Sequence, residues 1–437
     1  MSEMMPFIMF ASVFLLLLLG YPVALTLGGV SVLFGVMTFG LDFFALLPMR
    51  IWGTMTNYVL LAVPLFVFMG VMLEKSGIAE RMLESMGSLF GRFRGGLALS
   101  VVIVGALLAA STGIVGATVV TMGLMSLPAM LKRGYRPELA TGTIAASGTL
   151  GQIIPPSIVL VLLGSILNVS VGDMFMGAFV PGLLLVVCYM LYIILLALLR
   201  PDSMPPVPKD AAGRSGIVWK TLLEAFVVPM FLVLAVLGSI FAGIASPTEA
   251  AAIGAFGAIL LTLYQRKMTM EVLRAVMRET TWLTSMVFII LAGASAFSLV
   301  FRGMHGDTIL SNAILQANFQ PEVFLAMVML GVFIAGFFID FIEIIFIIVP
   351  VVAPVFVAFG VDLLWVGVLI AMNLQASFLT PPFGFSLFYL KGVAPKEVTT
   401  AHLYRGIIPF IVIQVLMLVL IIIFPEIVTW LPDLLGR

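Results

Sequence analysis

Long apolar runs, separated by short polar stretches, recur along the whole chain. Runs such as residues 407–424, and 103–110 within the longer apolar stretch 97–130, approach the roughly 20 residues that a membrane-spanning helix needs. Divided on this basis, the chain holds about ten to thirteen membrane segments. The first segment, residues 5–39, is too long for a signal peptide and lacks its small-residue cleavage pattern. The pattern therefore predicts an all-α polytopic membrane protein that keeps its first segment.

Composition and charge support a chain that is solvated by lipid. Of the 437 residues, 62% are hydrophobic and 10% are charged, whereas a soluble domain has about 25% charged residues. The net charge is zero, and the lack of a basic or acidic tail argues against a nucleic-acid partner. Cys188 is the single cysteine, so it forms no intrachain disulfide, and its apolar surroundings favour a packing role.

Basic residues gather in some polar stretches and are missing from others, which is the pattern that orients membrane helices because cationic loops stay cytoplasmic. Residues 168–173, 245–248 and 316–322 carry no lysine or arginine, which places them outside. The basic sets are Arg92 and Arg94; Lys132, Arg133 and Arg136; and those within residues 200–220, 266–278 and 391–405. This assignment gives alternating crossings from residue 97 to the end.

Two segments cannot cross the bilayer under this assignment. Residues 97–130 have basic residues at both ends, so we expect a re-entrant hairpin that enters from the cytoplasm and turns near Ser111-Thr112-Gly113. Residues 322–359 have none near either end, so a second hairpin enters from outside. Irregular backbone leaves amides unpaired in lipid, so both tips must lie against protein or water.

The two hairpins belong to an internal repeat. Shifting the sequence by 226 residues aligns them, and the segments that follow, without a gap. The matched pairs are Gly105 with Gly331, Ala109 with Ala335, Pro128 with Pro354, Gly134 with Gly360, Ile144-Ala145 with Ile370-Ala371, and Pro155-Pro156 with Pro381-Pro382. Because one copy starts inside and the other outside, the repeat is inverted. Secondary transporters have this architecture, with the binding site at the repeat interface.

The matched double prolines predict two broken helices, about residues 138–166 and 362–390. A break frees carbonyls for a cation such as sodium and presents half-helix amides to an anion. An ordinary proline kink is the alternative, but two symmetric Pro-Pro pairs beside polar residues favour a site. The candidates for contact with the solute are Thr112, Ser147, Gln152, Asn373, Gln375 and Asp340.

Four blocks resemble the large membrane subunit of the tripartite ATP-independent periplasmic (TRAP) transporters, and the similarity covers nearly the whole chain. The blocks are Ala110 to Gly113 with Lys132-Arg133-Gly134-Tyr135; Ala146 to Gly151 with Pro155-Pro156-Ser157; Gly243 to Ala251; and Asn373 to Gly384. Gly151-Gln152 before the first double proline is similar to a subfamily linked to keto acids and related monocarboxylates.

The resemblance implies a sodium-coupled elevator transporter that works with a small four-helix membrane subunit and a periplasmic binding protein. It further implies two sodium sites. The first matches Ser111, Gly151, Ile154 and Pro156, and the second matches Gly336, Ser377 and Thr380. Two features depart from the usual family pattern. The first tip lacks consecutive serines, and Ser377 replaces a usual glycine.

The expected organisation is two repeats held by scaffold helices. The divisions are residues 1–96 (scaffold helices and an interfacial arm helix), 97–200 (first repeat), 201–218 (cytoplasmic linker), 219–280 (scaffold helices and a second arm helix) and 281–437 (second repeat). Residues 79–93 and 269–280 have the amphipathic pattern of arm helices that lie along the cytoplasmic interface.

Few charged residues lie within the apolar runs. Asp340 and Glu343 are in the second hairpin, where Asp340 either caps the tip or joins a sodium shell. Glu249 follows Ser246 and Pro247 in the pattern of a helix-starting capping box. His305 and His402 stand outside any ligand-spaced cluster, so we predict no metal role for them.

These features predict sodium-coupled import of a small organic acid across the bacterial inner membrane, without an organic cofactor. The main alternative is a self-sufficient sodium/dicarboxylate symporter of similar elevator architecture, which would need neither partner. The sequence has no phosphate loop for ATP-driven pumping. It also shows neither the polar constellation of a membrane enzyme nor the continuous polar pore of a channel.

Overall fold

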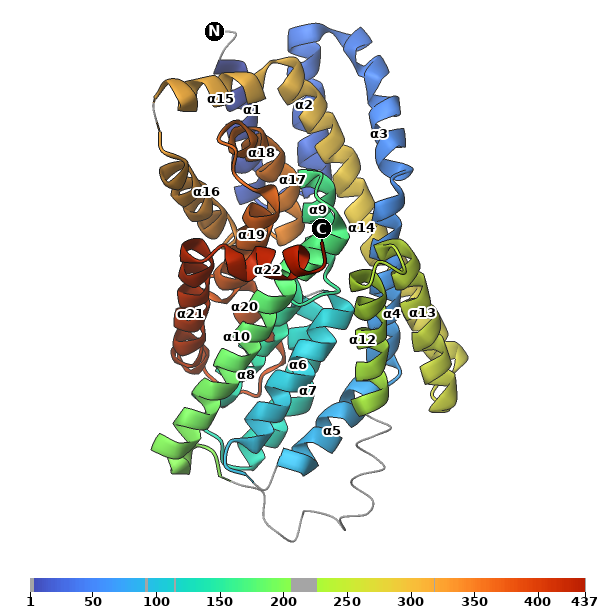
Figure 1. Cartoon of the computed structure of the whole chain (residues 1–437), viewed down its shortest axis with the longest axis vertical. Helices are drawn as coiled ribbons and strands as arrows, with labels where there is room; N and C mark the ends of the chain where they lie inside the picture. The colour runs from blue at the N-terminus through green and yellow to red at the C-terminus, as the bar shows by residue number, and fades with distance from the viewer. Residues whose placement is uncertain (1–3, 91–92, 114, 206–225, 318, 437) are drawn as a thin grey trace.

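The computed structural model describes residues 4–90, 93–113, 115–205, 226–317 and 319–436, apart from the side chains of Ser88, Ser111 and Thr112. Most of the predicted linker, from residue 206 onward, lies outside these ranges. The described residues form helices joined by short turns, without a β-strand (Figure 1). Six of the described helices are long and apolar enough to cross a membrane, and seven shorter apolar helices of 10–17 residues accompany them. The polytopic all-helical architecture is confirmed, and the number of membrane segments stays a prediction.

The scaffold precedes each repeat in the chain. Its first group is α1 (Met5–Leu18), α2 (Val23–Phe39), η2 (Leu41–Leu46), α3 (Leu47–Met55), η3 (Tyr58–Leu61), α4 (Ala62–Lys75) and α5 (Ile78–Phe90). Its second group is α12 (Val228–Phe241), α13 (Pro247–Tyr264), α14 (Met270–Gly303) and α15 (Gly306–Gln316). The two groups pack together, because α14 contacts both α2 and α4 and α13 contacts α4.

The sequence interpretation was wrong about two scaffold segments. Residues 5–39 form two helices instead of one, because Gly20 adopts a positive φ of 85° and Pro22 caps the start of α2. Residues 269–280 form no separate arm helix. They are the first turns of α14, a helix of 34 residues that continues past the expected boundary at 280 to Gly303. It contains no proline, and its first glycine is Gly293. The other amphipathic segment does form a helix of its own, α5.

The two copies of the repeat have matching helices. The first copy comprises α6 (Gly96–Thr112), α7 (Val115–Lys132), α8 (Pro137–Thr149), η4 (Leu150–Gln152), α9 (Ile158–Leu167) and α10 (Val171–Leu199), followed by η5 (Pro201–Ser203). The second comprises α16 (Pro321–Ala335), α17 (Phe341–Ile347), α18 (Val349–Ala358), α19 (Leu363–Leu379), α20 (Phe385–Val393) and α21 (Thr400–Ile423), followed by α22 (Glu426–Leu434). Residues 115–132 shifted by 226 become 341–358, the span of α17 and α18.

The copies differ in the second arm of the hairpin. In the first copy this arm is the single helix α7, whereas in the second copy it bends by 50° between α17 and α18. Pro350 lies in the first turn of α18, where it cannot donate a backbone hydrogen bond. The equivalent position in the first copy is Leu124, which leaves α7 continuous.

Packing between the copies indicates that equivalent helices, such as α8 in the first copy and α19 in the second, run in opposite directions. His402 near the start of α21 lies 4.0 Å from Glu138 near the start of α8, so these packed helices run parallel. Gly177 of α10 faces Leu364 of α19, and Tyr189 further along α10 faces Gln375 further along α19, so this pair is also parallel. Because α10 turns back on α8 and α9 after residues 168–170, α19 runs opposite to its counterpart α8. This arrangement supports an inverted repeat.

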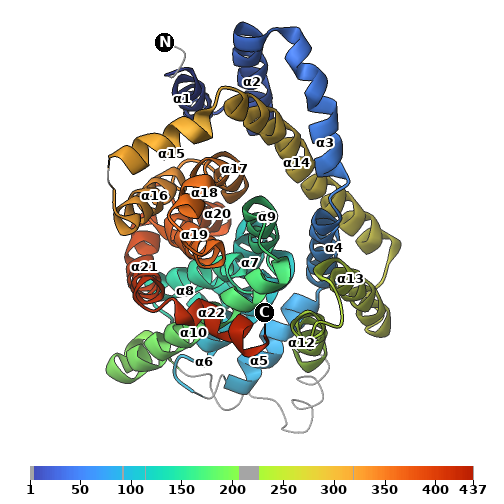
Figure 2. The same cartoon turned by 45° about the horizontal axis from the view of Figure 1, so that its top comes forward.

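The second half of each broken helix packs into the other copy. Helix α9 contacts α17, α18 and α19, and α20 contacts α7 and α8. Figure 2 shows the two copies gathered together, with α14 running past them as a long rod beside α2 and α4. The repeats therefore form one interlocked body beside the scaffold.

The repeat symmetry predicts opposite exposure of two equivalent positions. Lys132 and Ala358 are related by the 226-residue shift, and both are exposed. In a Cys188→Ala background, we expect a membrane-impermeant thiol reagent to label Ala358→Cys in intact spheroplasts. The same reagent should label Lys132→Cys only after the membrane has been permeabilised. Labelling of both positions from the same side would contradict the inverted topology.

Candidate functional site

The first broken helix consists of α8, which ends at Thr149, and α9, which begins at Ile158. Between them, η4 is followed by residues 153–157, which belong to neither helix. The peptide bond between the two prolines is cis here and also in the second copy. Ser157 stands at the N-cap of α9 but makes no side-chain cap, since its hydroxyl donates to the carbonyl of Gln152 at 3.0 Å. The first-turn amides of α9 are therefore free of a side-chain cap.

The tip of the first hairpin rests against this break. Gly113 ends α6 with a positive φ of 62°, and a Cβ there would lie 2.9 Å from Cγ1 of Ile158. A Cβ on Gly151 would overlap the carbonyl of Ala109 near the end of α6. Glycine at both positions therefore allows the tip and the break to approach closely.

The predicted members of the first sodium site lie on the two elements that make this contact. Gly151, Ile154 and Pro156 lie in or beside the break, and Ser111 lies at the end of α6. The side chains of Ser111 and Thr112 lie outside the described residues. Ile154 and Pro156 lie outside regular helix, so their carbonyls are not committed to a helical ladder.

The second tip and the second break meet in the same way. Helix α16 ends at Ala335, and a Cβ on the following Gly336 would lie 2.8 Å from Cβ of Ser377 in α19. The hydroxyl of Ser377 donates to the carbonyl of Leu374 at 2.8 Å, and that of Thr380 to Ala376 at 2.8 Å. Each hydroxyl oxygen keeps its lone pairs for a further contact, which suits a hard cation that prefers neutral oxygen ligands.

The structure divides the side chains that were predicted to contact the solute. Gln152 is fully buried, and its amide has no hydrogen-bond partner among the described residues. Ser147 donates to Ile144 at 3.0 Å within its own helix. Asn373 donates to the carbonyl of Met329 at 2.6 Å, which ties α19 to the second hairpin. Gln152 is therefore the candidate with an uncommitted polar group at a break.

Gln375 lies in a buried polar cluster with residues of α10 and α21. Its amide faces the hydroxyl of Tyr189 on α10, which also faces Gln414 on α21. All three side chains are fully buried, and none closes a hydrogen bond among the described residues. The sequence interpretation missed this cluster, although a glutamine and a tyrosine inside strongly apolar helices were a signal for it.

Asp340 and Glu343 form a capping box at the start of α17. The carboxylate of Asp340 accepts the N–H of Phe341 at 2.7 Å, and Glu343 accepts the backbone N–H of Asp340 at 3.2 Å. The structural alternative for Asp340 is therefore present, and a role in solute or sodium binding stays a prediction.

Asp340 also lines a cavity of about 650 Å³ between the scaffold and the hairpins. Gly116 and Thr121 of α7 and Phe341 of α17 line it on one side, and scaffold residues of α4 and α14 line the other. Its charged residues are Glu74, Lys75, Glu279 and Asp340. Because Lys75 and Glu279 lie near the ends with cytoplasmic loops, we call this the inner cavity.

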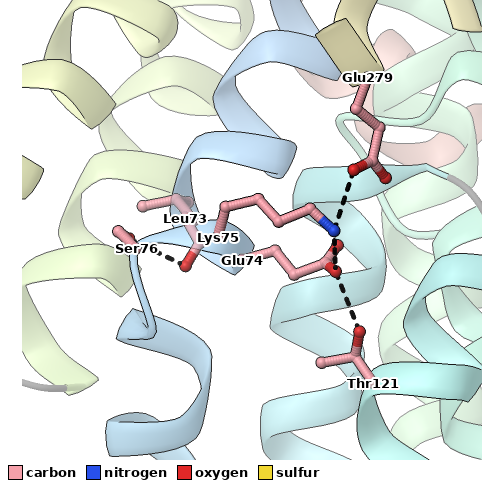
Figure 3. A network of polar contacts seen from close by, with 6 residues as sticks. All are labelled: Leu73, Glu74, Lys75, Ser76, Thr121 and Glu279. Carbon is pink, nitrogen blue, oxygen red and sulfur yellow. Dashed lines mark hydrogen bonds and ion pairs between the residues drawn. The ribbon is translucent and has the colours of Figure 1, made fainter. Parts of the chain in front are cut away.

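A polar network in the inner cavity joins the scaffold to the first hairpin (Figure 3). Thr121 of α7 donates to the carboxylate of Glu74 at 3.0 Å. Lys75 contacts Glu74 at 3.3 Å and Glu279 of α14 at 2.9 Å. The side chain of Glu74 is 10% exposed. The sequence interpretation missed this network, although three charges at the ends of apolar helices were a signal for it.

Two further polar pairs cap the starts of helices. The capping box predicted at Ser246 and Glu249 is confirmed at the start of α13. His402 forms a comparable box with Thr399 at the start of α21. Within the described ranges, no three His, Cys, Asp or Glu residues are grouped as a metal site would require.

Comparison with known proteins identifies relatives along almost the whole chain. The family model described as "Tripartite ATP-independent periplasmic transporter, DctM component" matches residues 10–427. The C4-dicarboxylate TRAP transporter large permease protein of Vibrio cholerae is 31% identical, over 98% of this chain and 97% of its own length. The ectoine TRAP transporter large permease protein of Halomonas elongata is also 31% identical, over 98% and 99% of the two chains.

One further curated relative and one solved structure complete the comparison. The sialic acid TRAP transporter large permease protein of Vibrio cholerae is 30% identical, over 96% of each chain. The crystal structure of the Alcanivorax borkumensis YdaH transporter has a TM-score of 0.65 at 16% identity, and the match covers 98% of this chain and all of that one. This last likeness supports the fold alone.

The contact between Gly336 and Ser377 predicts a large effect of one added methyl group. Gly336→Ala would place a Cβ against Ser377, so we expect a loss of about 1–3 kcal/mol of stability, as in overpacked cores. Gly331→Ala on α16 is the matched control, because a Cβ there meets nothing within 4 Å. Thermal unfolding of the purified protein measures both. We expect Ser377→Gly to rescue Gly336→Ala, and equal melting temperatures for the two alanine variants would contradict the close contact.

Proposed function

The chain belongs to the DctM component family of the tripartite ATP-independent periplasmic transporters, which are multi-pass proteins of the bacterial inner membrane, and we propose that it is a sodium-coupled importer. The solute that we propose for it is a small organic acid. The observation that carries the proposal is the pairing of each interrupted helix with a glycine-lined hairpin tip. In the first pairing, Gly113 lies against Ile158 and Gly151 against Ala109, and in the second Gly336 lies against Ser377. Each pairing gathers main-chain and hydroxyl oxygens away from lipid.

The two tip-and-break units are the proposed sodium sites. In the first, the ligands would be the carbonyls of Gly151, Ile154 and Pro156 together with Ser111 at the end of α6. In the second, Ser377 and Thr380 supply hydroxyl oxygens whose protons are already donated within α19. Sodium is here a cotransported ion, and binding it would draw each tip onto its broken helix.

The solute would bind between the two units and move with the interlocked repeats. Uncapped amides at the start of α9 attract a carboxylate, and the free amide of Gln152 can orient it. The inner cavity is lined by Asp340 at the second tip, which supports a path from the tips toward the cytoplasm. We propose that the repeats slide past α4 and α14 as an elevator, and that the network around Glu74 forms in this inward-facing state.

The proposed transporter has two protein partners. Relatives at about 30% identity are named large permease proteins of TRAP transporters. We propose that a small four-helix membrane subunit braces the scaffold and that a periplasmic binding protein delivers the solute. The named solutes of these relatives are a C4-dicarboxylate, ectoine and sialic acid, each of which carries a carboxylate.

Sodium coupling predicts a change at Thr380. In proteoliposomes that hold the chain with its two partners, we expect uptake to stop when potassium replaces sodium. Thr380→Val removes the hydroxyl oxygen and should raise the half-saturating sodium concentration by about tenfold, the equivalent of roughly 1.4 kcal/mol. Thr380→Ser keeps the oxygen and is the matched control. Undiminished uptake in potassium would reject sodium coupling.

A requirement for both partners separates the proposal from the self-sufficient symporter. We expect no uptake by the purified chain alone, and sodium-driven uptake once the small subunit and the loaded binding protein are added. Uptake by the chain alone, at the rate of the complete system, would favour the symporter.

A further inference from the structure

Two arginines on the outer side of the protein depart from the charge pattern of the rest of the chain. Lysines and arginines of the described residues otherwise lie at the cytoplasmic ends of helices or in cytoplasmic loops, as the predicted orientation requires. Arg50 lies in α3, which leads into the first residues of α4, and these are at the outer end of α4. Arg302 lies at the outer end of α14. A cation on the outer side works against this orientation rule, so a specific reason for two of them is needed.

Both arginines line one cavity. Its volume is about 410 Å³, and we call it the outer cavity. Arg50 and Arg302 are exposed, and neither makes an ion pair with a described residue. The cavity is also lined by small polar side chains that can accept or donate a hydrogen bond: Thr54, Asn57, Ser165, Asn168, Ser295 and Ser298.

The outer cavity lies where the scaffold meets the interlocked repeats. Thr54 of α3 and Ser295 of α14 are 3.2 Å apart on the scaffold side. Asn57 bridges to Ser165 of α9 at 3.3 Å, and Phe346 and Pro350 of the second hairpin close the far wall. A ligand in this cavity would therefore touch the fixed and the proposed moving parts together.

The two cavities have opposite charge. The outer cavity is lined by two arginines and by no acidic residue. The inner cavity is lined by Glu74, Glu279 and Asp340 against the single cation Lys75. A cleft lined by one sign of charge concentrates ions of the other sign and speeds their arrival by about 10–10³-fold. The outer cavity is thus suited to receive an anion, and the inner cavity to release one.

We propose that the outer cavity is a reception site for the carboxylate of the solute, with Arg50 and Arg302 as its binding groups. The guanidinium group matches a carboxylate because it presents two parallel N–H donors. This site deepens the proposed function and rests on it. It holds the anion between release from the binding protein and entry between the hairpin tips, so it sets how efficiently solute is captured and leaves the sodium sites unchanged.

The charge of the outer cavity can be measured without any transport. In a Cys188→Ala background, Ser298→Cys places a reporter thiol in the outer cavity. The ratio of its reaction rates with an anionic and a cationic methanethiosulfonate of similar size reports the local potential. We expect the ratio to fall about tenfold in Arg50→Gln/Arg302→Gln and to be kept in Arg50→Lys/Arg302→Lys. Ala117→Cys in the inner cavity is the matched control. We expect its rate ratio to favour the cationic reagent and to stay the same when both arginines are substituted.

Binding is tested with succinate as the probe, at constant ionic strength. We expect succinate to slow labelling of Ser298→Cys, and the double glutamine variant to lose this protection. The reception site would be overturned if the rate ratio were the same with and without the two arginines, or if succinate protected Ser298→Cys equally in the double glutamine variant.

Uptake separates failure of this site from failure of the proposed function. In the complete system, the double glutamine variant should raise the half-saturating concentration of loaded binding protein by about tenfold, with the maximal rate and the sodium dependence unchanged. Sodium-driven uptake with an unaltered half-saturation would reject the reception site alone. Absence of sodium-driven uptake in the unsubstituted protein would instead reject the proposed function. If the double glutamine variant bound the empty and the loaded binding protein equally more weakly, the arginines would belong to a protein-docking surface, and the reception site would be overturned.

Discussion

The satisfaction of backbone polar groups away from water is the constraint on which this structure depends. An interrupted helix leaves amides and carbonyls without their regular partners, and in lipid each such group costs several kcal/mol. Among the described residues, two helices are interrupted at double prolines; the first break is almost entirely buried, and the second is covered by protein up to Leu379, with Pro382 and Phe383 exposed. Gly113 and Gly151 let the first hairpin tip close on the first break, and Gly336 lets the second tip close on Ser377. The proposed sodium ions would satisfy the oxygens that remain.

The inverted repeat explains how two such breaks lie in one body. Because α19 runs opposite to α8, the second half of each broken helix enters the other copy, as α9 does against α17, α18 and α19 and as α20 does against α7 and α8. Each break is then partly covered by the other copy. The scaffold contacts this body through the polar bridges Thr121 to Glu74 and Asn57 to Ser165. A few polar bridges are easier to exchange during sliding than an extended polar interface.

The sequence predicted the features that depend on local chemistry. Double prolines mark both breaks, and Ser246 with Glu249 marks a capping box, because each of these signals acts within a few residues. Two local signals were misread. Gly20 and Pro22 divide residues 5–39, and the absence of any breaker between residues 270 and 292 joins the arm to α14. Side-chain partners could not be predicted, since helices that are apolar on every side do not show which face meets protein. Asn373 and Gln375 are two residues apart, yet one binds the second hairpin and the other faces Tyr189.

The central claim is that the tip-and-break units bind sodium in the folded protein, and ligand-linked stability tests it most directly. A ligand that binds the native state alone adds about 2.7 kcal/mol at 100 times its dissociation constant. Purified protein should therefore melt at a temperature that rises steadily with sodium concentration at constant ionic strength, and that stays flat when potassium replaces sodium. Superimposable melting curves in the two salts would contradict the claim.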